Sequence, residues 1–580
     1  MSIGDERDGM AVDWDVAITM DDGLVLRADV YRPQPEGQYP VLLNYGPYAK
    51  GLPFQVGYAS AWDQMVTNYP EVAEGSTNKY QHWEAVDPEK WVPDGYACVR
   101  VDSRGWGRSP GYGDPFSPRE TRDLYECIEW AGTQDWSNGK VGLAGISYYA
   151  INQWHVAALK PPHLAAMVPW EGAGDFYRDW SYHGGIRCTG MNVWYSRVVA
   201  KLQHGRGDRE PVNPNTGELV TGPQTLSNEE LTENRVDLVG SIKARPLDGE
   251  FFRQRSADWS KIEVPFLSAG NWGGHGLHLR GNVEGFGRAA SEQKWLEIHG
   301  REHWTEFYTD YGVGVQKEFF DHFLKGIDNG FQDRPPVHLR IRTEGGFVGR
   351  DEHEWPLART EWTKLYLDPA KLRLEDRPVA DPGAVGYDAT GDGVTFTTPP
   401  LEAQTEITGP VAARLFVSSE TTDADIFLVL RVFRPDDSEV VFQAAVDPHG
   451  PIGQGWLRVS HRKLDPDLST HYRPYHTHDE VEPLTPGEVY EIDVEIWPTS
   501  IVVPAGHRIA LTVRGKDYEY PGGPAELSHF KGSAMRGSGI YLHDDLDDRP
   551  AETYGQEVTL HLGGERDAYI QLPVIPPRDG

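Results

Sequence analysis

The sequence has only three cysteines among 580 residues, and no two of them form a Cys-x-x-Cys pair. Three cysteines are too few for a disulfide framework, and their spacing does not match a zinc ribbon or finger. No apolar run approaches the roughly 20 residues that a membrane-spanning helix needs. The first ten residues, MSIGDERDGM, lack the basic start and apolar stretch of a signal peptide. We therefore expect a cytoplasmic protein that does not enter a membrane.

Positive charge is also scarce. The chain has 55 Lys and Arg against 88 Asp and Glu, which gives a formal net charge of −33. Such an excess of negative charge repels phosphate backbones and anionic lipid surfaces, so neither nucleic acid nor a membrane is an expected partner. In contrast, 39% of the residues are hydrophobic, which is enough to fill the cores of several domains.

Local patterns divide the chain into three parts. Residues 1–174 and 249–350 alternate short apolar runs with amphipathic stretches, which predicts a mostly parallel sheet covered by helices. Residues 175–248 interrupt that alternation, and we interpret them as a helical cap. Residues 351–580 contain short β-branched runs separated by Pro and Gly turns, which predicts an antiparallel jelly-roll sandwich.

The segment KVGLAGIS is an apolar strand that runs directly into a helical stretch at Ser147. A Gly two residues before a Ser, between a strand and a helix, is typical of a nucleophile elbow. The usual pattern is Gly-x-Ser-x-Gly, but here Tyr149 takes the place of the final Gly. The backbone N–H of Tyr148, at the start of the helix, would point at a developing oxyanion. The alternative is that Ser147 only caps the helix.

Several further segments accompany this motif: MDDGLVLRADVYRP, VRVDSRGWGRSPG, WSNGKVGLAGISYYAINQWHVAALKPPHLAAMVP, GPVAARLFVSS and PAGHRIALTV. With them the chain resembles the cocaine esterase/X-prolyl dipeptidyl peptidase family (CocE/NonD, S15-like) of serine hydrolases over nearly its whole length. The resemblance implies an α/β-hydrolase domain with an inserted helical cap and a carboxyl-terminal jelly roll. It also implies hydrolysis of small acyl esters or amides by a Ser-His-Asp triad, without a metal or an organic cofactor.

Matched to the family pattern, Ser147 is the nucleophile. The amide of Tyr148 and the phenol of Tyr48, in the loop NYGPYAK, form the oxyanion hole. The base should follow the last strand of the sheet, where the chain reads KWLEIHGREHW. His303 takes the family's position there, and His299 is the second choice.

The acid departs from the family pattern. The family's Asp follows a Gly-Gly-Trp motif, but the equivalent segment here is GNWGGH, which leaves Gly274 at that position. A neighbouring strand end could supply a replacement, because an anion on the imidazole fixes its tautomer. The strand from Leu164 to Pro169 is followed by Trp170 and Glu171, so we predict Glu171 as the acid, with Asp175 as the second choice. Glu171 could instead be a solvated loop carboxylate, or the site could lack an acid.

Two other patterns have alternative interpretations. His299 to His303 spells the His-x-x-Glu-His pattern of some zinc peptidases, but Gly300 directly after a strand argues against the continuous helix that zinc binding needs. The Gly-rich segment from Asp102 to Ser109 matches no phosphate-binding loop. We expect an ion pair of Asp102 with Arg104 to fix it beneath the site.

The leading hypothesis is a serine hydrolase of carboxylic esters, with amides or peptides as further substrates. The alternatives are a catalytically degenerate ligand-binding protein, an X-prolyl or aminoacyl peptidase, and a zinc hydrolase. Aromatic residues from the segments around the cleft could form an acyl or leaving-group pocket. The tryptophans in these segments are Trp62, Trp83, Trp106, Trp154, Trp170, Trp180, Trp194 and Trp272.

The exposed face of the β domain is compatible with a homodimer.

Overall fold

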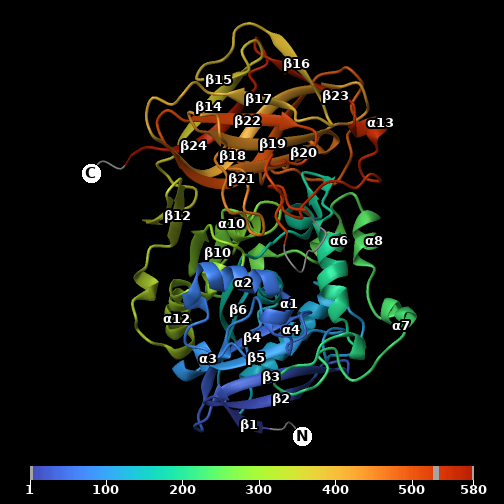
Figure 1. Cartoon of the computed structure of the whole chain (residues 1–580), viewed down its shortest axis with the longest axis vertical. Coiled ribbons are helices and arrows are strands. Elements are labelled where there is room, and N and C mark those ends of the chain that lie inside the picture. The colour runs from blue at the N-terminus through green and yellow to red at the C-terminus, as the bar shows by residue number, and fades with distance from the viewer. Residues whose placement is uncertain (1–3, 527–533, 578–580) are drawn as a thin grey trace.

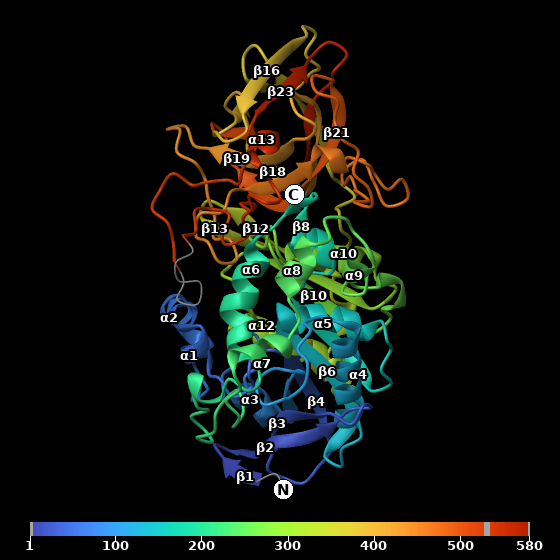
Figure 2. The same cartoon turned by 90° about the vertical axis from the view of Figure 1, so that its right-hand side faces the viewer.

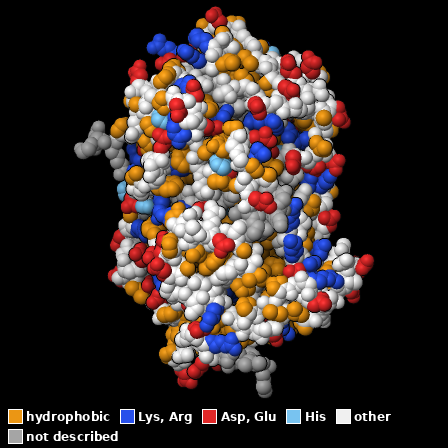
Figure 3. Space-filling view, in the orientation of Figure 1, with side chains coloured by type: hydrophobic (Ala, Val, Ile, Leu, Met, Phe, Trp, Pro, Cys, Tyr) orange, Lys and Arg blue, Asp and Glu red, His pale blue; other side chains and the backbone are white. Residues whose placement is uncertain are grey.

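The computed structural model describes residues 4–526 and 534–577. An α/β part and an all-β part are stacked along the long axis of the molecule, with the N-terminus at the far end of the α/β part (Figure 1). On the face in Figure 3, acidic, basic and hydrophobic side chains are interspersed over both parts. No helix within the described ranges is both long enough and apolar enough to cross a bilayer.

The α/β part contains a sheet with the strand order β1-β2-β3-β5-β4-β6-β7-β10-β11-β12-β13. The strands from β5 to β12 in this order are parallel, and antiparallel strands are added at both ends. The strands are β1 (Gly4–Arg7), β2 (Met10–Thr19), β3 (Val25–Pro33), β4 (Tyr39–Gly46), β5 (Ala97–Asp102), β6 (Ser137–Ile146), β7 (Leu164–Trp170), β10 (Phe266–Asn271), β11 (Lys294–His299), β12 (Val337–Thr343) and β13 (Gly346–Glu352).

Helices cover both faces of this sheet. Successive residues of β4 point to opposite faces, so Leu42 joins one hydrophobic core while Val41 and Leu43 join another. The first core contains α12, and the second contains α4 and part of α5. The helices of this part are α1 (Phe54–Gly57), α2 (Ala59–Asn68), η1 (Pro70–Val72), α3 (Pro88–Trp91), η2 (Val92–Asp94), α4 (Pro118–Gly132), α5 (Tyr148–Ala157), η7 (Trp259–Lys261), α10 (Leu279–Arg288), α11 (Thr305–Tyr308), α12 (Asp310–Lys325) and η8 (Phe331–Asp333).

A run of short helices and two short strands follows β7. The stretch from Gly190 to Leu202 is continuously helical, although it changes from α to π to 3₁₀ geometry. Figures 1 and 2 both place α6 next to the all-β part. The elements are η3 (Phe176–Ser181), β8 (Tyr182–His183), β9 (Ile186–Arg187), α6 (Gly190–Trp194), η4 (Tyr195–Val199), η5 (Ala200–Leu202), η6 (Gly207–Arg209), α7 (Asn228–Glu233), α8 (Leu238–Lys243) and α9 (Glu250–Arg253).

The all-β part is barrel-like, because β18 pairs with β21, β23 and β24 and so links the two ends of the strand order. Nearly all of its pairings are antiparallel, with β15 and β17 as a parallel exception. Its elements are β14 (Glu361–Asp368), β15 (Arg373–Glu375), β16 (Gly383–Asp388), β17 (Val394–Thr397), β18 (Thr405–Ser419), β19 (Asp425–Phe433), β20 (Gly453–Arg458), η9 (Val459–His461), β21 (Tyr490–Val503), β22 (Arg508–Arg514), α13 (Ala551–Tyr554), β23 (Glu557–Leu562) and β24 (Tyr569–Ile575).

The Gly-rich segment after β5 is fixed differently from the prediction. The expected ion pair of Asp102 with Arg104 is wrong, because Arg104 pairs with Asp123 and Asp22. Asp102 instead accepts the backbone N–H groups of Lys50 and Arg108, at 2.6 and 2.8 Å. The backbone of this loop turns Arg104 toward α4, and the carboxylate of Asp102 joins the loop to the segment that follows β4.

Candidate active site

Ser147 lies at the sharp turn between β6 and α5. Its backbone has φ 58° and ψ −115°, a strained conformation for a residue with a side chain. The turn is tight, because a Cβ atom at Gly145 would lie 2.5 Å from the Cβ of Tyr149. The N–H of Ser147 donates to the carbonyls of Trp170 and Glu171, both at 3.1 Å. The backbone at Ser147 thus has the geometry expected of a nucleophile elbow.

The hydroxyl of Ser147 has an imidazole neighbour that the sequence did not indicate. His278 lies in the loop after β10, and its Nε2 is 3.1 Å from Ser147 Oγ. The backbone N–H of Ala173 donates to His278 Nδ1 at 3.1 Å. Nδ1 is therefore an acceptor, so the proton of the neutral ring is on Nε2, and Nε2 donates to Ser147 Oγ.

His303 and Glu171, which the sequence assigns as base and acid, are hydrogen-bonded to each other. His303 Nδ1 lies 2.6 Å from Glu171 Oε2, and both side chains are buried. The ring of His303 stacks on that of His278, with centroids 5.3 Å apart and an interplanar angle of 10°. A proton on Nδ1 is required for the bond to a carboxylate, so the lone pair of the neutral ring is on Nε2.

The two imidazoles have opposite electrostatic environments. Burial alone would lower the pKa of His303, but the carboxylates of Glu171 and then Glu84 raise it above its ordinary value. Burial, and then the neighbouring His303, lower the pKa of His278 well below its ordinary value. His303 is therefore the more basic of the two rings, whereas His278 remains neutral.

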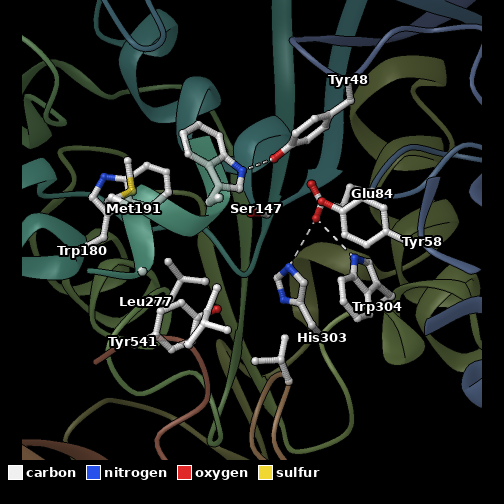
Figure 4. A pocket seen from close by; sticks show the side chains of 14 residues that line it. Tyr48, Tyr58, Glu84, Ser147, Trp180, Met191, Leu277, His303, Trp304 and Tyr541 are labelled. Carbon is white, nitrogen blue, oxygen red and sulfur yellow. Dashed lines mark hydrogen bonds and ion pairs between the residues drawn. The ribbon is translucent and has the colours of Figure 1, made fainter. Parts of the chain in front are cut away.

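Glu84 also lies in the pocket, although no sequence motif marks it. Its Oε1 accepts the indole N–H of Trp304 at 3.3 Å and lies 3.5 Å from His303 Nε2 (Figure 4). Its other oxygen is buried and has no hydrogen-bond partner within the described part of the chain. Burial raises the pKa of this carboxyl group. A backbone φ of 64° holds Glu84 in the left-handed region, as at Ser147.

Two donors are available near the hydroxyl of Ser147. The indole N–H of Trp194 donates to Tyr48 Oη at 3.0 Å, which leaves the phenolic proton of Tyr48 to point elsewhere (Figure 4). Burial raises the pKa of Tyr48, so its phenol stays protonated. Tyr148 is the first residue of α5, where backbone N–H groups have no acceptor inside the helix.

The pocket is built from all parts of the chain (Figure 4). The predicted aromatic wall includes Trp180 and Trp194, whereas the other six tryptophans do not line this pocket. The all-β part contributes directly to the site, because Ala445 also accepts the backbone N–H of His303 at 2.9 Å. The lining residues are Tyr48, Tyr58, Glu84, Ser147, Trp180, Gly190, Met191, Trp194, Leu277, His303, Trp304, Val446, Ile540 and Tyr541.

The second-choice residues have other contacts. His299 Nε2 accepts the indole N–H of Trp170 at 3.1 Å and lies 3.3 Å from Glu171 Oε1. Asp175 caps η3 and pairs with Arg178. Each of these residues has a structural partner, and within the described ranges neither is hydrogen-bonded to Ser147 or His303.

Comparisons with known proteins agree with this architecture. The family described as X-Pro dipeptidyl-peptidase (S15 family) matches residues 22–305, and the X-Pro dipeptidyl-peptidase C-terminal non-catalytic domain matches residues 329–528. A cocaine esterase from Rhodococcus sp. (strain MB1 Bresler) is 25% identical, covering 97% of this chain and 98% of its own. A putative Xaa-Pro dipeptidyl-peptidase from Streptomyces avermitilis is 24% identical, covering 74% of this chain and 68% of its own.

A solved structure extends the likeness to the whole molecule. The crystal structure of a CocE/NonD family hydrolase from Staphylococcus aureus has a TM-score of 0.83 and 30% sequence identity, and covers 98% of this chain and 94% of its own. These matches confirm the predicted α/β-hydrolase fold with a carboxyl-terminal all-β domain. The chain therefore belongs to the CocE/NonD family of hydrolases and is itself a hydrolase enzyme.

Proposed function

We propose that the protein is a serine esterase that cleaves carboxylic esters through an acyl-enzyme on Ser147. The observation that carries the proposal is the hydrogen-bonded pair of His303 and Glu171, which opens on the same pocket as Ser147. A base oriented by an acid beside a strained serine is the arrangement that activates a hydroxyl nucleophile. The relatives named as esterases support this assignment.

In the proposed reaction, Ser147 Oγ attacks the ester carbonyl while His303 Nε2 takes its proton. Glu171 holds the proton on Nδ1 and stabilises the imidazolium that forms. The phenol of Tyr48 and the N–H of Tyr148 stabilise the oxyanion of the tetrahedral intermediate. The imidazolium then gives its proton to the departing alkoxide. Water, deprotonated by the same ring, hydrolyses the acyl-enzyme and restores Ser147.

His278 has a different role in this scheme. As the base it would become an imidazolium, which would place a proton on Nδ1 against the N–H of Ala173. Two donors facing each other in a buried site are costly. We therefore assign His278 as a positioning residue, whose Nε2–H orients Ser147 Oγ and leaves the serine proton directed elsewhere.

A second candidate is hydrolysis of aminoacyl esters or amides, which the unpartnered oxygen of Glu84 favours. A buried carboxylate in the substrate pocket would gain a strong, charge-assisted hydrogen bond from a substrate ammonium. Relatives named as putative Xaa-Pro dipeptidyl-peptidases are consistent with such substrates. Simple esters remain the first choice because an alkoxide leaves more readily than an amine.

The test compares p-nitrophenyl acyl esters with the corresponding aminoacyl esters and anilides. Ser147→Ala should abolish turnover and labelling by a fluorophosphonate probe. Ser196→Ala is the matched control, because Ser196 is an exposed serine next to the pocket-lining α6. Full turnover in the Ser147→Ala protein would refute the proposal. A wild-type protein that neither labels nor turns over any substrate would favour the ligand-binding alternative.

The same panel separates the two substrate classes. If Glu84 binds an ammonium group, Glu84→Gln should raise KM for aminoacyl substrates and leave KM for simple acyl esters nearly unchanged. An equal effect on both classes would remove the second candidate. The cytoplasmic location and a homodimer stay predictions, to be checked by cell fractionation and sedimentation analysis.

A further inference from the structure

A second cluster of reactive side chains lies outside the catalytic pocket. His183 at the end of β8, Cys188 just before α6, and His543 from the all-β part have their Nδ1 or Nε2 and Sγ atoms all within 4.8 Å of one another. All three side chains are buried. Residues distant in the sequence thus bring two imidazoles and a thiol to one point.

The outer nitrogens of both imidazoles are held by acceptors. His183 Nε2 lies 3.1 Å from the carbonyl oxygen of Asp179, and His543 Nδ1 lies 2.8 Å from Asp517 Oδ1. The other oxygen of Asp517 accepts the backbone N–H of His543 at 2.7 Å, which fixes the carboxylate. A carbonyl and a carboxylate can only accept, so each of these ring nitrogens carries its proton.

The inner nitrogens, His183 Nδ1 and His543 Nε2, consequently face each other with their lone pairs. They are 2.9 Å apart. Two lone pairs at this distance repel unless a cation lies between them, and the cation can be a metal ion or an additional proton. The thiol of Cys188 beside both nitrogens favours the metal, because a thiolate is a ligand for soft and borderline cations.

Aromatic side chains enclose the cluster. Trp456 packs against both rings, at centroid distances of 4.9 Å from His183 and 5.6 Å from His543. Phe427 covers His543 from another side, with centroids 5.3 Å apart. Metal-binding histidines commonly donate their second N–H to a carboxylate or carbonyl, and both histidines here do so.

We propose that His183 Nδ1, His543 Nε2 and Cys188 Sγ bind a zinc ion. Typical zinc bonds are about 2.0–2.1 Å to imidazole nitrogen and about 2.3 Å to thiolate sulfur, so the nitrogens already lie close enough to share one ion. Three protein ligands leave a fourth position for water. This site is separate from the His299–His303 segment, where the sequence suggested a zinc motif, and it departs from the expectation that the protein needs no metal.

The zinc ion would hold the wall of the catalytic pocket rather than take part in catalysis. Gly190 and Met191 follow Cys188 and line the pocket, and Ile540 and Tyr541 precede His543 and line it too. The ion would therefore clamp the segment around α6 to the all-β part directly behind the substrate site. This inference does not depend on the proposed esterase activity.

The test is metal analysis of the full-length protein by inductively coupled plasma mass spectrometry. We expect about one zinc per chain in the wild type and in Cys98→Ser, the matched control, because Cys98 is a buried free cysteine in β5. Cys188→Ser and His543→Gln should lose most of the zinc. Zinc that persists in both variants would place the metal elsewhere and overturn the proposal.

A second measurement covers variants that fail to fold. Wild-type protein stripped by a chelator is titrated with Zn²⁺, and with Co²⁺ as a spectroscopic probe. Zinc should raise the melting temperature, because a ligand that binds only the folded state stabilises it. Cobalt should give the near-ultraviolet absorption of a thiolate complex. If stripped protein binds neither ion, a shared proton joins the two imidazoles and the zinc proposal is wrong.

Discussion

The role of Glu171 can be tested by Glu171→Gln, which preserves the size of the side chain but changes its hydrogen bonding. Asn271 Nδ2 donates to Glu171 Oε1 at 3.2 Å. Asn271 cannot flip without loss, because the same Nδ2 donates to the carbonyl of Arg301 and its Oδ1 accepts the N–H of Gly273. In the variant, the amide oxygen should therefore face Asn271, and the amide NH₂ should face His303 Nδ1. His303 would then carry its proton on Nε2, where it cannot accept one from Ser147.

The size of the effect follows from this competition. Turning the glutamine so that its NH₂ faces Asn271 leaves buried donors opposed, at a cost of about 1–3 kcal/mol. Because about 1.36 kcal/mol corresponds to a tenfold change in population, the productive tautomer becomes about 5- to 150-fold rarer. Loss of the anion that stabilises the imidazolium lowers kcat further. In other triads, the wrong tautomer lowers kcat by about 10⁴-fold. We expect a fall in kcat of about 10²- to 10⁴-fold, with KM little changed.

The assay is p-nitrophenyl ester hydrolysis under saturating substrate. The matched control is Glu129→Gln, because Glu129 Oε2 lies 2.8 Å from His163 Nδ1 in a partly exposed pair. This control makes the same substitution in a Glu–His pair outside the pocket, so it should keep the wild-type kcat. If Glu171→Gln retains kcat within about threefold of the wild type, Glu171 is not the acid and the assignment of His303 loses its main support.

Three further variants probe the same pocket. Tyr48→Phe should lower kcat by about 10²- to 10³-fold, the usual effect of removing one oxyanion donor, and an unchanged kcat would exclude the phenol from the oxyanion hole. Glu84→Gln removes a carboxylate that raises the pKa of His303, so the ascending limb of the kcat/KM–pH profile should move to lower pH; a shift to higher pH would contradict the electrostatics. His278→Phe should lower kcat without abolishing the pH dependence, and His278→Gln, which keeps an N–H donor, should retain more activity. Loss of the ascending limb in both His278 variants would identify His278 as the base.

The sequence was informative where local rules determine the structure. The elbow at Ser147 was predictable, because a strand that turns abruptly into a helix needs a small residue at Gly145. The same turn directs the side chain of Ser147 outward. The helix α4 was predictable because Leu124, Cys127 and Ile128 share one of its faces.

The parts of the site that were missed depend on distant contacts. His278 lies beside Ser147 in a loop that contacts Ala173, 105 positions earlier in the chain. Glu84 reaches the pocket because an irregular segment with a positive φ turns its side chain toward His303. Neither contact has a local sequence pattern. The presence of a histidine in the loop after β10, at the same sheet edge as Ser147, was the one available signal.

The proposed position of the acid, at Glu171, is explained by the order of the strands. β7 and β10 are neighbouring parallel strands, with Trp170 paired to Ala269, so the residues that follow them emerge at one edge of the sheet. A carboxylate from either strand end can therefore reach the same imidazole. At Gly274, where the family pattern has its Asp, a Cβ atom would lie 3.1 Å from the carbonyl oxygen of Asn271 and 3.2 Å from the backbone nitrogen of Leu279. A side chain there would force that loop to shift. Glu171 needs no such shift, because the left-handed backbone at φ 49° already brings its carboxylate to His303.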